Sequence, residues 1–368
     1  MSMRSHPLVS AIVPAYNAEP FIRETLCSVL SQTYQSIEVL VVDDGSTDRT
    51  PSIVEEMAEQ DPRIKLFRQK NQGVAAARNL AIAHAKGAYI APVDADDIWY
   101  PTKIEKQVQR MEEYPEAGCA YTWSVSINEK GKLLDAGSQW DLEGKVYEPL
   151  VLRNFVGNAS VPLFRTSALG QVGGYNEKLR VLNAQGCEDW EICLRVAEHY
   201  DYCVIQEYLV GYRCYSQSMS YNHEAMGRSY ELVMEEVQRR HPEIKPHIHR
   251  WSRSLFYLYL TNKSNVSGDL RSSYRWLLKA IKEDPMVLTM PWVFRCFVNR
   301  SIRMAAYAIT RSPKVWAQLN SGFSEAQPAL TFEQIIADAQ SKRTPHTYFE
   351  RILQQRWITA TNNRSVTC

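Results

Sequence analysis

The first hundred residues alternate between short apolar runs and amphipathic stretches, and this alternation limits the possible fold more than any other feature. Four runs have the length and composition of buried strands: 9–13, 38–42, 64–67 and 88–93. Three stretches between them have helical character: 21–30, 51–60 and 73–85. Strands that alternate with helices through short connections predict an α/β fold, with a mostly parallel sheet covered by helices on both faces.

Polar clusters follow three of the expected strands. They occupy 14–17, 43–48 and 94–97. In parallel α/β sheets, ligands bind outside the carboxyl ends of the strands. The sequence therefore predicts that these clusters meet at one ligand site.

The composition is that of a globular protein. Of 368 residues, 45% are hydrophobic and 23% charged, which excludes a disordered or collagen-like chain. Lys and Arg number 42 and Asp and Glu 41, so the net charge of +1 gives no electrostatic reason to expect nucleic acid as a partner. The longest run without a charged side chain, Ser5–Ala18, has 14 residues, whereas a membrane-spanning helix needs about 20.

The N-terminus and the cysteines favour a cytoplasmic location. Residues 1–7 contain one Arg and are not followed by the apolar segment of a signal peptide. The eight cysteines form no Cys-x-x-Cys pair, so a thiolate zinc site has little support. We expect free thiols in a reducing compartment.

The cluster 94–97 is a candidate metal site. Asp94, Asp96 and Asp97 bring three carboxylates into four residues, and such carboxylates repel one another unless a cation is present. Mg²⁺ and Mn²⁺ usually bind one or two carboxylates together with substrate phosphate. The alternative is a solvated turn whose aspartates cap the next helix.

Two other clusters are candidate nucleotide contacts. Asp44 ends the second expected strand, where a carboxylate could bind a base or a ribose. Gly73 begins a helix of small residues that carries Arg78, and arginine can bind a phosphate or a base. The alternative for this helix is an alanine face packed on the sheet with Arg78 at its rim. The glycine-rich loops of dinucleotide oxidoreductases and P-loop hydrolases are absent from the sequence.

Residues 8 to about 220 resemble a family 2 glycosyltransferase with the GT-A fold, a Rossmann-like α/β sheet flanked by helices. The resemblance depends on an ordered series of motifs, each weak by itself. They are VSAIVPAYN (9–17), VVDDGSTD (41–48), NQG (71–73), ARN (77–79), DADD (94–97) with Pro101, GGYNE (173–177), EDW (188–190), YR (212–213) and SMS (218–220).

The resemblance implies an inverting transfer of a sugar from a nucleotide-diphosphate sugar, by default a uridine diphosphate sugar, to a hydroxyl of a glycan or lipid-linked glycan. It implies Asp189 as the general base, although Asp189 could instead serve only as a favourable charge at a helix start. It implies Mn²⁺ or Mg²⁺ held by Asp96 as the main ligand and by Asp94. The nucleotide sugar would meet Pro14, Tyr16, Asn17, Asp44, Gly73, Arg78, Asp94 and Asp96. We place Glu188 and Trp190 at the acceptor.

The sequence departs from the family pattern at two places. Tyr215 stands where members often carry a histidine that assists at the diphosphate. The Gln-x-x-Arg-Trp signature of processive members is approached at 354–357, but Leu353 stands where its glutamine would be. We therefore expect an enzyme that adds a single sugar.

The domain organisation expected from the sequence has three parts. A catalytic domain, 1–221, would consist of a nucleotide-sugar half (about 1–115) and an acceptor half (about 116–221). A helical region would follow at 222–358, then a loose tail at 359–368. No internal repeat of fixed period is present.

The segment 286–324 has five basic residues and no acidic one. On a helical wheel, Phe294, Phe297, Val298, Ile302, Ala305 and Ile309 share one side, and Arg300, Arg303 and Arg311 share the other. Such a helix could lie on an anionic membrane surface beside a lipid-linked acceptor, at the cytoplasmic face. Packing of the apolar side on the catalytic domain, with the arginine side in water, is the favoured alternative.

Two other functions compete with glycosyl transfer. A catalytically silent protein that only binds a sugar nucleotide is disfavoured, because Asp94, Asp96 and Asp189 are all present. A sugar nucleotidyltransferase is disfavoured, because no glycine-rich phosphate loop follows Val13.

Overall fold

The computed structural model describes residues 6–137, 139–215, 218 and 222–310, and for 303–310 it describes the backbone alone. The chain divides into two compact units, 1–242 and 243–368. The boundary expected from the sequence lay at 221–222, so the helix that follows it belongs to the first unit. The expected tail, 359–368, lies outside the described residues.

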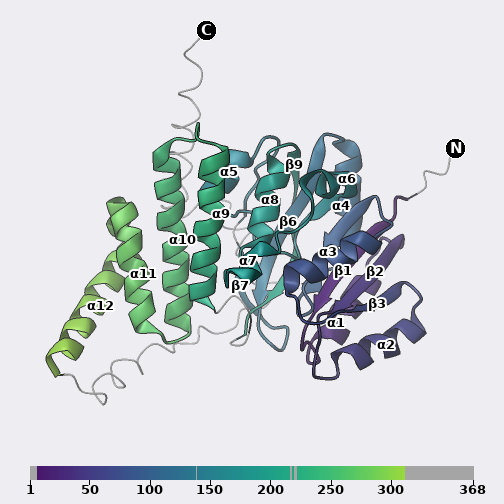
Figure 1. Ribbon diagram of the computed structural model, residues 1–368, viewed down its shortest axis with the longest axis horizontal. Coiled ribbons are helices and arrows are strands. Elements are labelled where there is room, and N and C mark those ends of the chain that lie inside the picture. The colour runs from purple at the N-terminus through teal and green to yellow at the C-terminus, as the bar shows by residue number, and fades with distance from the viewer. Residues whose placement is uncertain (1–5, 138, 216–217, 219–221, 311–368) are drawn as a thin grey trace, which may run out of the picture. The chain divides into compact units, whose positions relative to one another are not determined.

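The first unit contains the sheet (Figure 1). Its strands are β1 (Val9–Ala15), β2 (Ile37–Asp43), β3 (Ile64–Arg68), β4 (Tyr89–Pro92), β5 (Ile98–Trp99), β6 (Ala117–Ile127), β7 (Leu133–Ala136), β8 (Leu163–Arg165) and β9 (Asp201–Arg213). Its helices are α1 (Ile22–Leu30), α2 (Thr50–Gln60), α3 (Val74–His84), α4 (Lys103–Glu113), α5 (Tyr147–Leu152), α6 (Thr166–Val172), α7 (Lys178–Val181), α8 (Glu188–Ala197) and α9 (His223–Arg240). The expected strands and helices of the first hundred residues all form.

Within the described residues these strands make one sheet in the order β3-β2-β1-β4-β8-β6-β9-β5, with β7 added beside β6. The first four strands are parallel. β8 is antiparallel to both of its neighbours, and β9 runs parallel to β6. The expected α/β architecture, a mostly parallel sheet flanked by helices, is confirmed.

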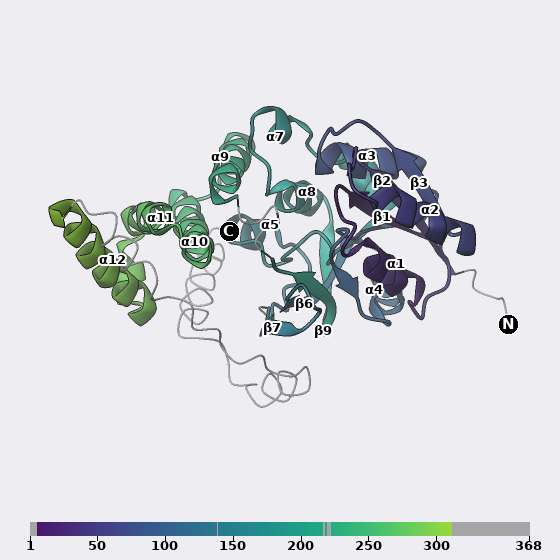
Figure 2. The ribbon, with the colours of Figure 1, turned by 90° about the horizontal axis from the view of Figure 1, so that it is seen from below.

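Burial on both faces explains why β1 and β2 are apolar throughout. Nearly every residue of β1 and all of β2 are buried. The small side chains of α3 let it pack closely on these two strands, and Figure 2 shows α1 and α4 on the opposite side. The register pairs Ala15 with Asp43 and Ile12 with Pro92. The polar clusters after β1, β2 and β4 therefore share one edge of the sheet.

The second unit is helical where it is described. It contains α10 (Pro246–Val266), α11 (Leu270–Glu283), the 3₁₀ helix η2 (Pro285–Thr289) and α12 (Pro291–Thr310). Asp269 caps α11 by accepting from Ser272 N at 3.0 Å. Helices α10 and α11 form a hairpin in which Ser254 Oγ donates to Ala280 O and the rings of Tyr257 and Trp276 stack. No described helix is long and apolar enough to cross a membrane.

Helix α12 exposes several residues of its expected apolar side and buries one arginine of the other side. Arg300, expected on the water side, is 6% exposed, whereas Ile302, expected on the packed side, is 62% exposed. Phe294 and Val298 are exposed as well, whereas Val293 is fully buried. Within the second unit, α12 contacts η2 and α11 through the side that carries Val293. The packing expected for 286–324, on the catalytic domain, stays a prediction. Arg311 and the rest of 311–324 lie outside the described residues.

One buried hydroxyl fixes α1 to the loop that follows β4. Thr25 Oγ1 in α1 lies 3.0 Å from Ala95 O and 2.8 Å from Asp97 O. Thr25 is fully buried. Its hydroxyl thus satisfies buried carbonyl groups of a loop that has no strand partner there.

We expect Thr25→Val to lower the free energy of unfolding by about 1–3 kcal/mol, because it removes a buried donor while keeping the shape of the side chain. Urea unfolding measures the change. Thr33→Val is the matched control, since the Thr33 hydroxyl contacts Pro101 O and Glu105 on the exposed surface. That control should change stability by less than about 0.5 kcal/mol. Equal losses in the two variants would contradict the role given to Thr25.

Candidate active site

The acidic loop 94–97 is held at both ends and in the middle. Asp94 N donates to Ser160 Oγ at 2.9 Å, and Asp97 N donates to Asp94 O at 3.1 Å. Thr25 binds two carbonyl groups of the loop from α1. These contacts come from two other segments and from within the loop itself, so the loop backbone has little freedom to move.

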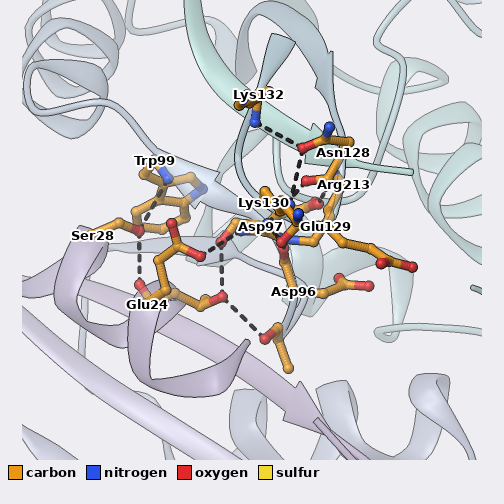
Figure 3. Close-up of polar contacts among 12 residues, drawn as sticks. Glu24, Ser28, Asp96, Asp97, Trp99, Asn128, Glu129, Lys130, Lys132 and Arg213 are labelled. Carbon is orange, nitrogen blue, oxygen red and sulfur yellow. Dashed lines mark hydrogen bonds and ion pairs between the residues drawn. The ribbon is translucent and has the colours of Figure 1, made fainter. Parts of the chain in front are cut away.

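Arg213, at the end of β9, also holds the acidic loop (Figure 3). It is 1% exposed. Its Nε donates to Asp96 O at 2.6 Å, and its Nη1 donates to Asn128 O and Glu129 O at 3.1 and 2.8 Å. Its Nη2 pairs with Glu24 of α1 at 2.7 Å. One guanidinium thus joins the acidic loop, the β6–β7 turn and α1.

The three carboxylates of the loop have different surroundings. Asp97 is fully buried; its carboxylate accepts from Ser160 Oγ and, at 2.8 Å, from Arg213 N. Burial and then the charges of Asp96 and Asp94 raise the pKa of Asp97 well above its usual range. Asp97 therefore holds the loop in place and faces away from solvent.

Asp94 and Asp96 are half-buried and carry the exposed charge of the loop. Asp94 Oδ1 pairs with Arg78 Nη2 at 2.6 Å. The hydroxyl of Tyr215 hydrogen-bonds to Asp96. Burial, followed by the charge of Asp94, raises the pKa of Asp96. Two half-buried carboxylates that repel each other on a rigid loop fit a divalent cation.

No three described His, Cys, Asp or Glu side chains converge into a complete metal cage. A cation such as Mg²⁺ takes one or two carboxylates and completes its shell with water and substrate phosphate. The donor set of Asp94 and Asp96 therefore fits a cation that binds together with a phosphate-bearing ligand.

Arg78 connects the acidic loop to the start of α8. Its guanidinium lies 5.1 Å from the ring centre of Tyr175. Against the lowering effect of burial, the carboxylates of Asp94 and Asp189 raise the pKa of Arg78. The neighbouring Asn79 binds Tyr175 N and O and so fixes the 173–177 segment to α3. Asp94, Arg78 and Asp189, far apart in sequence, are thereby brought together.

Glu188 and Asp189 begin α8 but differ in accessibility. Glu188 is buried, and its carboxylate accepts from Gly186 N at 2.8 Å. Asp189 is half-buried, and its Oδ1 accepts from Trp190 N at 2.7 Å. Burial raises the pKa of Asp189 to about 7, although the charge of Arg78 opposes this rise. A carboxylate with a pKa near neutrality can accept a proton from a hydroxyl more readily than one with the usual value.

Trp190 points into the core of the first unit. It is 4% exposed, its Nε1 donates to Leu150 O at 2.8 Å, and its ring lies 5.5 Å from that of Tyr230. This geometry favours a packing role over the acceptor contact expected for Trp190.

The loops after β1 and β2 form the other side of the site. Tyr16 is 53% exposed, while Pro14 is half-buried in β1. Asn17 adopts a left-handed conformation with φ of 49°, and its Oδ1 accepts from Thr47 N at 2.8 Å. This bond joins the two loops at the edge where the strand ends meet.

Asp44 is buried beneath the 69–73 loop. Its Oδ1 accepts from Gln69 Nε2 and Gln72 N, each at 2.7 Å, and its Oδ2 accepts from Gly73 N at 2.7 Å. Gly73 has φ of 91°, a conformation that side chains other than glycine rarely adopt. The residues expected at the nucleotide in these loops, from Pro14 to Gly73, thus lie in loops that bind one another.

Sequence reasoning missed several residues that build this site. Thr25 and Ser160 are single hydroxyls in unremarkable surroundings, so no sequence signal could have found them. Arg213 belongs to a family motif, but only the structure shows what it binds. Tyr215 stood out as a departure from the family, and its contact with Asp96 appears only in three dimensions.

Known proteins with similar sequences are glycosyltransferases. The sequence profile of glycosyl transferase family 2 matches residues 10–159. TuaG of Bacillus subtilis (strain 168), named provisionally as a teichuronic acid biosynthesis glycosyltransferase, is 32% identical over 238 residues, which cover 64% of this chain and 90% of that protein. An uncharacterized glycosyltransferase of Rickettsia felis is 35% identical over 189 residues, 51% of this chain. The match spans about 30% of the length of the Rickettsia protein.

Solved structures share the fold. S. aureus TarS 1–349 superposes with a TM-score of 0.53 at 20% identity, covering 87% of this chain and 92% of that one. The mannosyltransferase PcManGT from Pyrobaculum calidifontis superposes with a TM-score of 0.54 at 17% identity, covering 92% and 87%. The sheet, the ordered motifs and the extent of the match to TuaG lead to one conclusion: this chain belongs to glycosyl transferase family 2.

Proposed function

We propose that this chain transfers a sugar from a nucleotide-diphosphate sugar to a hydroxyl of a glycan or lipid-linked glycan, with inversion at the sugar carbon. The observation that carries the proposal is the arrangement of Asp94, Arg78 and Asp189. A rigid acidic loop suited to a cation lies near a half-buried carboxylate whose pKa is raised to about 7. The solved relatives support the donor class: TarS has been solved with UDP-GlcNAc, and PcManGT with GDP-Man and Mn²⁺.

In the proposed reaction, Asp189 takes the proton from the acceptor hydroxyl as its oxygen attacks the sugar carbon. The bond from that carbon to the diphosphate breaks on the opposite side, so no enzyme nucleophile is needed. Asp94 and Asp96 would hold Mn²⁺ or Mg²⁺, which supplies charge neutralisation at the leaving diphosphate. Arg78 keeps Asp94 oriented through their ion pair of 2.6 Å.

The nucleotide half of the donor would lie at the loops after β1 and β2. The exposed ring of Tyr16 can stack on a base, with Pro14 and Asn17 shaping the same edge. The buried carboxylate of Asp44 would accept from the base, and Gly73 would permit close approach of the backbone. Uridine diphosphate is the proposed nucleotide. Glu188, which holds Gly186 N, would orient the start of α8 beside the acceptor.

Asp96→Asn should abolish Mn²⁺-dependent binding of the donor, because it removes the central anionic ligand, and Asp94→Asn should weaken it less. Titration calorimetry with UDP-sugars, with and without Mn²⁺, measures the effect. Asp61→Asn serves as the control, since Asp61 pairs with Arg63 before β3 and away from the acidic loop. If Asp96→Asn and Asp94→Asn both retain the Mn²⁺ dependence of the wild type, the metal assignment is wrong.

Asp189→Asn should lower turnover by about 10²–10⁴, because the amide cannot take a proton. Donor affinity should change little, and Glu188→Gln should be milder. The pH profile gives a second readout. Protonation of Asp189 removes the base, so the turnover number should fall as pH drops through about 7, and this limb should vanish in Asp189→Asn. A larger loss in Glu188→Gln, or near-normal turnover in Asp189→Asn, would move the base elsewhere.

We also propose that α12 contacts an anionic membrane surface. Its exposed apolar residues, Trp292, Phe294, Val298 and Ile302, accompany the exposed Arg295. Apolar side chains with neighbouring basic charge are typical of helices that lie at a lipid interface.

Co-sedimentation with vesicles containing anionic lipid should show binding that weakens with salt. Replacing Trp292 and Phe294 with Ser should reduce it several-fold, whereas Leu134→Ser, at an equally exposed apolar site on β7, should not. Absence of salt-sensitive binding by the wild-type chain would remove the membrane proposal.

A further inference from the structure

Arg180, in α7, lies directly over the loop that holds Asp44. Its Nη2 donates to Asn71 Oδ1 at 2.5 Å and lies 3.2 Å from Asn71 O. A Cβ placed on Gly73 would meet Arg180 Nη1 at 2.6 Å and Cδ at 2.7 Å. The absence of a side chain at Gly73 therefore makes room for Arg180.

The guanidinium of Arg180 also faces the carboxylate of Asp44. The distance from Arg180 Nη1 to Asp44 Oδ2 is 4.0 Å, which is an ion pair but too long for a hydrogen bond. Asp44 Oδ1 already accepts two hydrogen bonds, whereas Oδ2 accepts one, from Gly73 N. Since each carboxylate oxygen can accept about two, Oδ2 retains acceptor capacity beside the Arg180 donors.

Arg180 is better placed for this role than Arg78. Arg78, the other arginine expected near the donor, is buried, paired with Asp94 at 2.6 Å and stacked on Tyr175. The side chain of Arg180 is 36% exposed and can adjust to a ligand. Its rigid fork presents parallel N–H groups, which suit a carbonyl oxygen.

An acceptor beside a donor recognises a ligand edge with the complementary order, an N–H next to a C=O. Uracil and thymine present this edge at N3–H and O4, and guanine presents it at N1–H and O6. Cytosine and adenine present a ring-nitrogen acceptor next to an amino group, the reverse order. In the same orientation, with the ring nitrogen at Asp44, each would set acceptor against acceptor at Asp44 and donor against donor at Arg180.

We propose that Arg180 is a specificity-determining residue that acts with Asp44 to select a nucleoside diphosphate whose base has an N–H next to a carbonyl group. This inference rests on the proposed function, in which the base meets Asp44. It assigns to the acceptor half of the catalytic unit a direct part in choosing the donor.

The test compares the binding of UDP, dTDP, GDP, CDP and ADP to the full chain in the presence of Mn²⁺ by titration calorimetry. The wild type should bind at least one of UDP, dTDP and GDP about tenfold or more tightly than CDP and ADP. Arg180→Met has a similar length but no donors, so it should weaken the preferred nucleotide by about 10- to 100-fold. CDP affinity should remain within about twofold, and Arg180→Lys should recover part of the loss.

Lys178→Met is the matched control, because Lys178 lies on the exposed side of the same helix. It should leave every affinity unchanged. Tight UDP binding with unaltered discrimination in Arg180→Met, or a wild-type preference for CDP or ADP, would overturn the role of Arg180 alone. Failure of the wild type to bind any of the five nucleotides would overturn the proposed function together with this inference.

Discussion

The buried guanidinium of Arg213 is the interaction on which the arrangement of the site depends. It binds the backbone of the acidic loop at Asp96, two carbonyl groups of the β6–β7 turn, and Glu24 of α1. A buried charge of this kind is costly unless its donors are satisfied, and here several partners share it. The hydrogen bonds that satisfy the donors of Arg213 also fix the position of the acidic loop. The stability of the buried guanidinium and the placement of the loop therefore depend on the same contacts.

The rigid loop gives its carboxylates separate roles. Asp97 turns inward, and its carboxylate accepts the hydrogen bonds that hold the loop. Asp94 and Asp96 remain half-buried at the loop surface. Asp189 approaches from α8, and Arg78 lies near both Asp94 and Asp189. Burial raises the pKa of Asp189 to about 7, and burial is also the main cause that raises the pKa of Asp96.

Polar contacts also join the 173–180 segment to α3 and to the loops after β2 and β3. Arg180 crosses from α7 to Asn71 and faces Asp44, and Asn79 fixes the 173–177 segment to α3. The regions proposed to hold the donor and the acceptor are therefore joined by side chains that cross between them. A change in the 173–180 segment is expected to reach the proposed nucleotide site through these contacts.

The sequence by itself determined the α/β architecture, the strand ends that carry polar side chains, and the family, because apolar periodicity and motif order are local properties of the chain. It did not determine that Trp190 packs inward, that α12 exposes Ile302 and buries Arg300, or that Thr25 and Arg213 hold the acidic loop. Those outcomes depend on which distant surfaces meet. Burial and hydrogen-bond partners are set by contacts across the fold, and only the tertiary structure decides them.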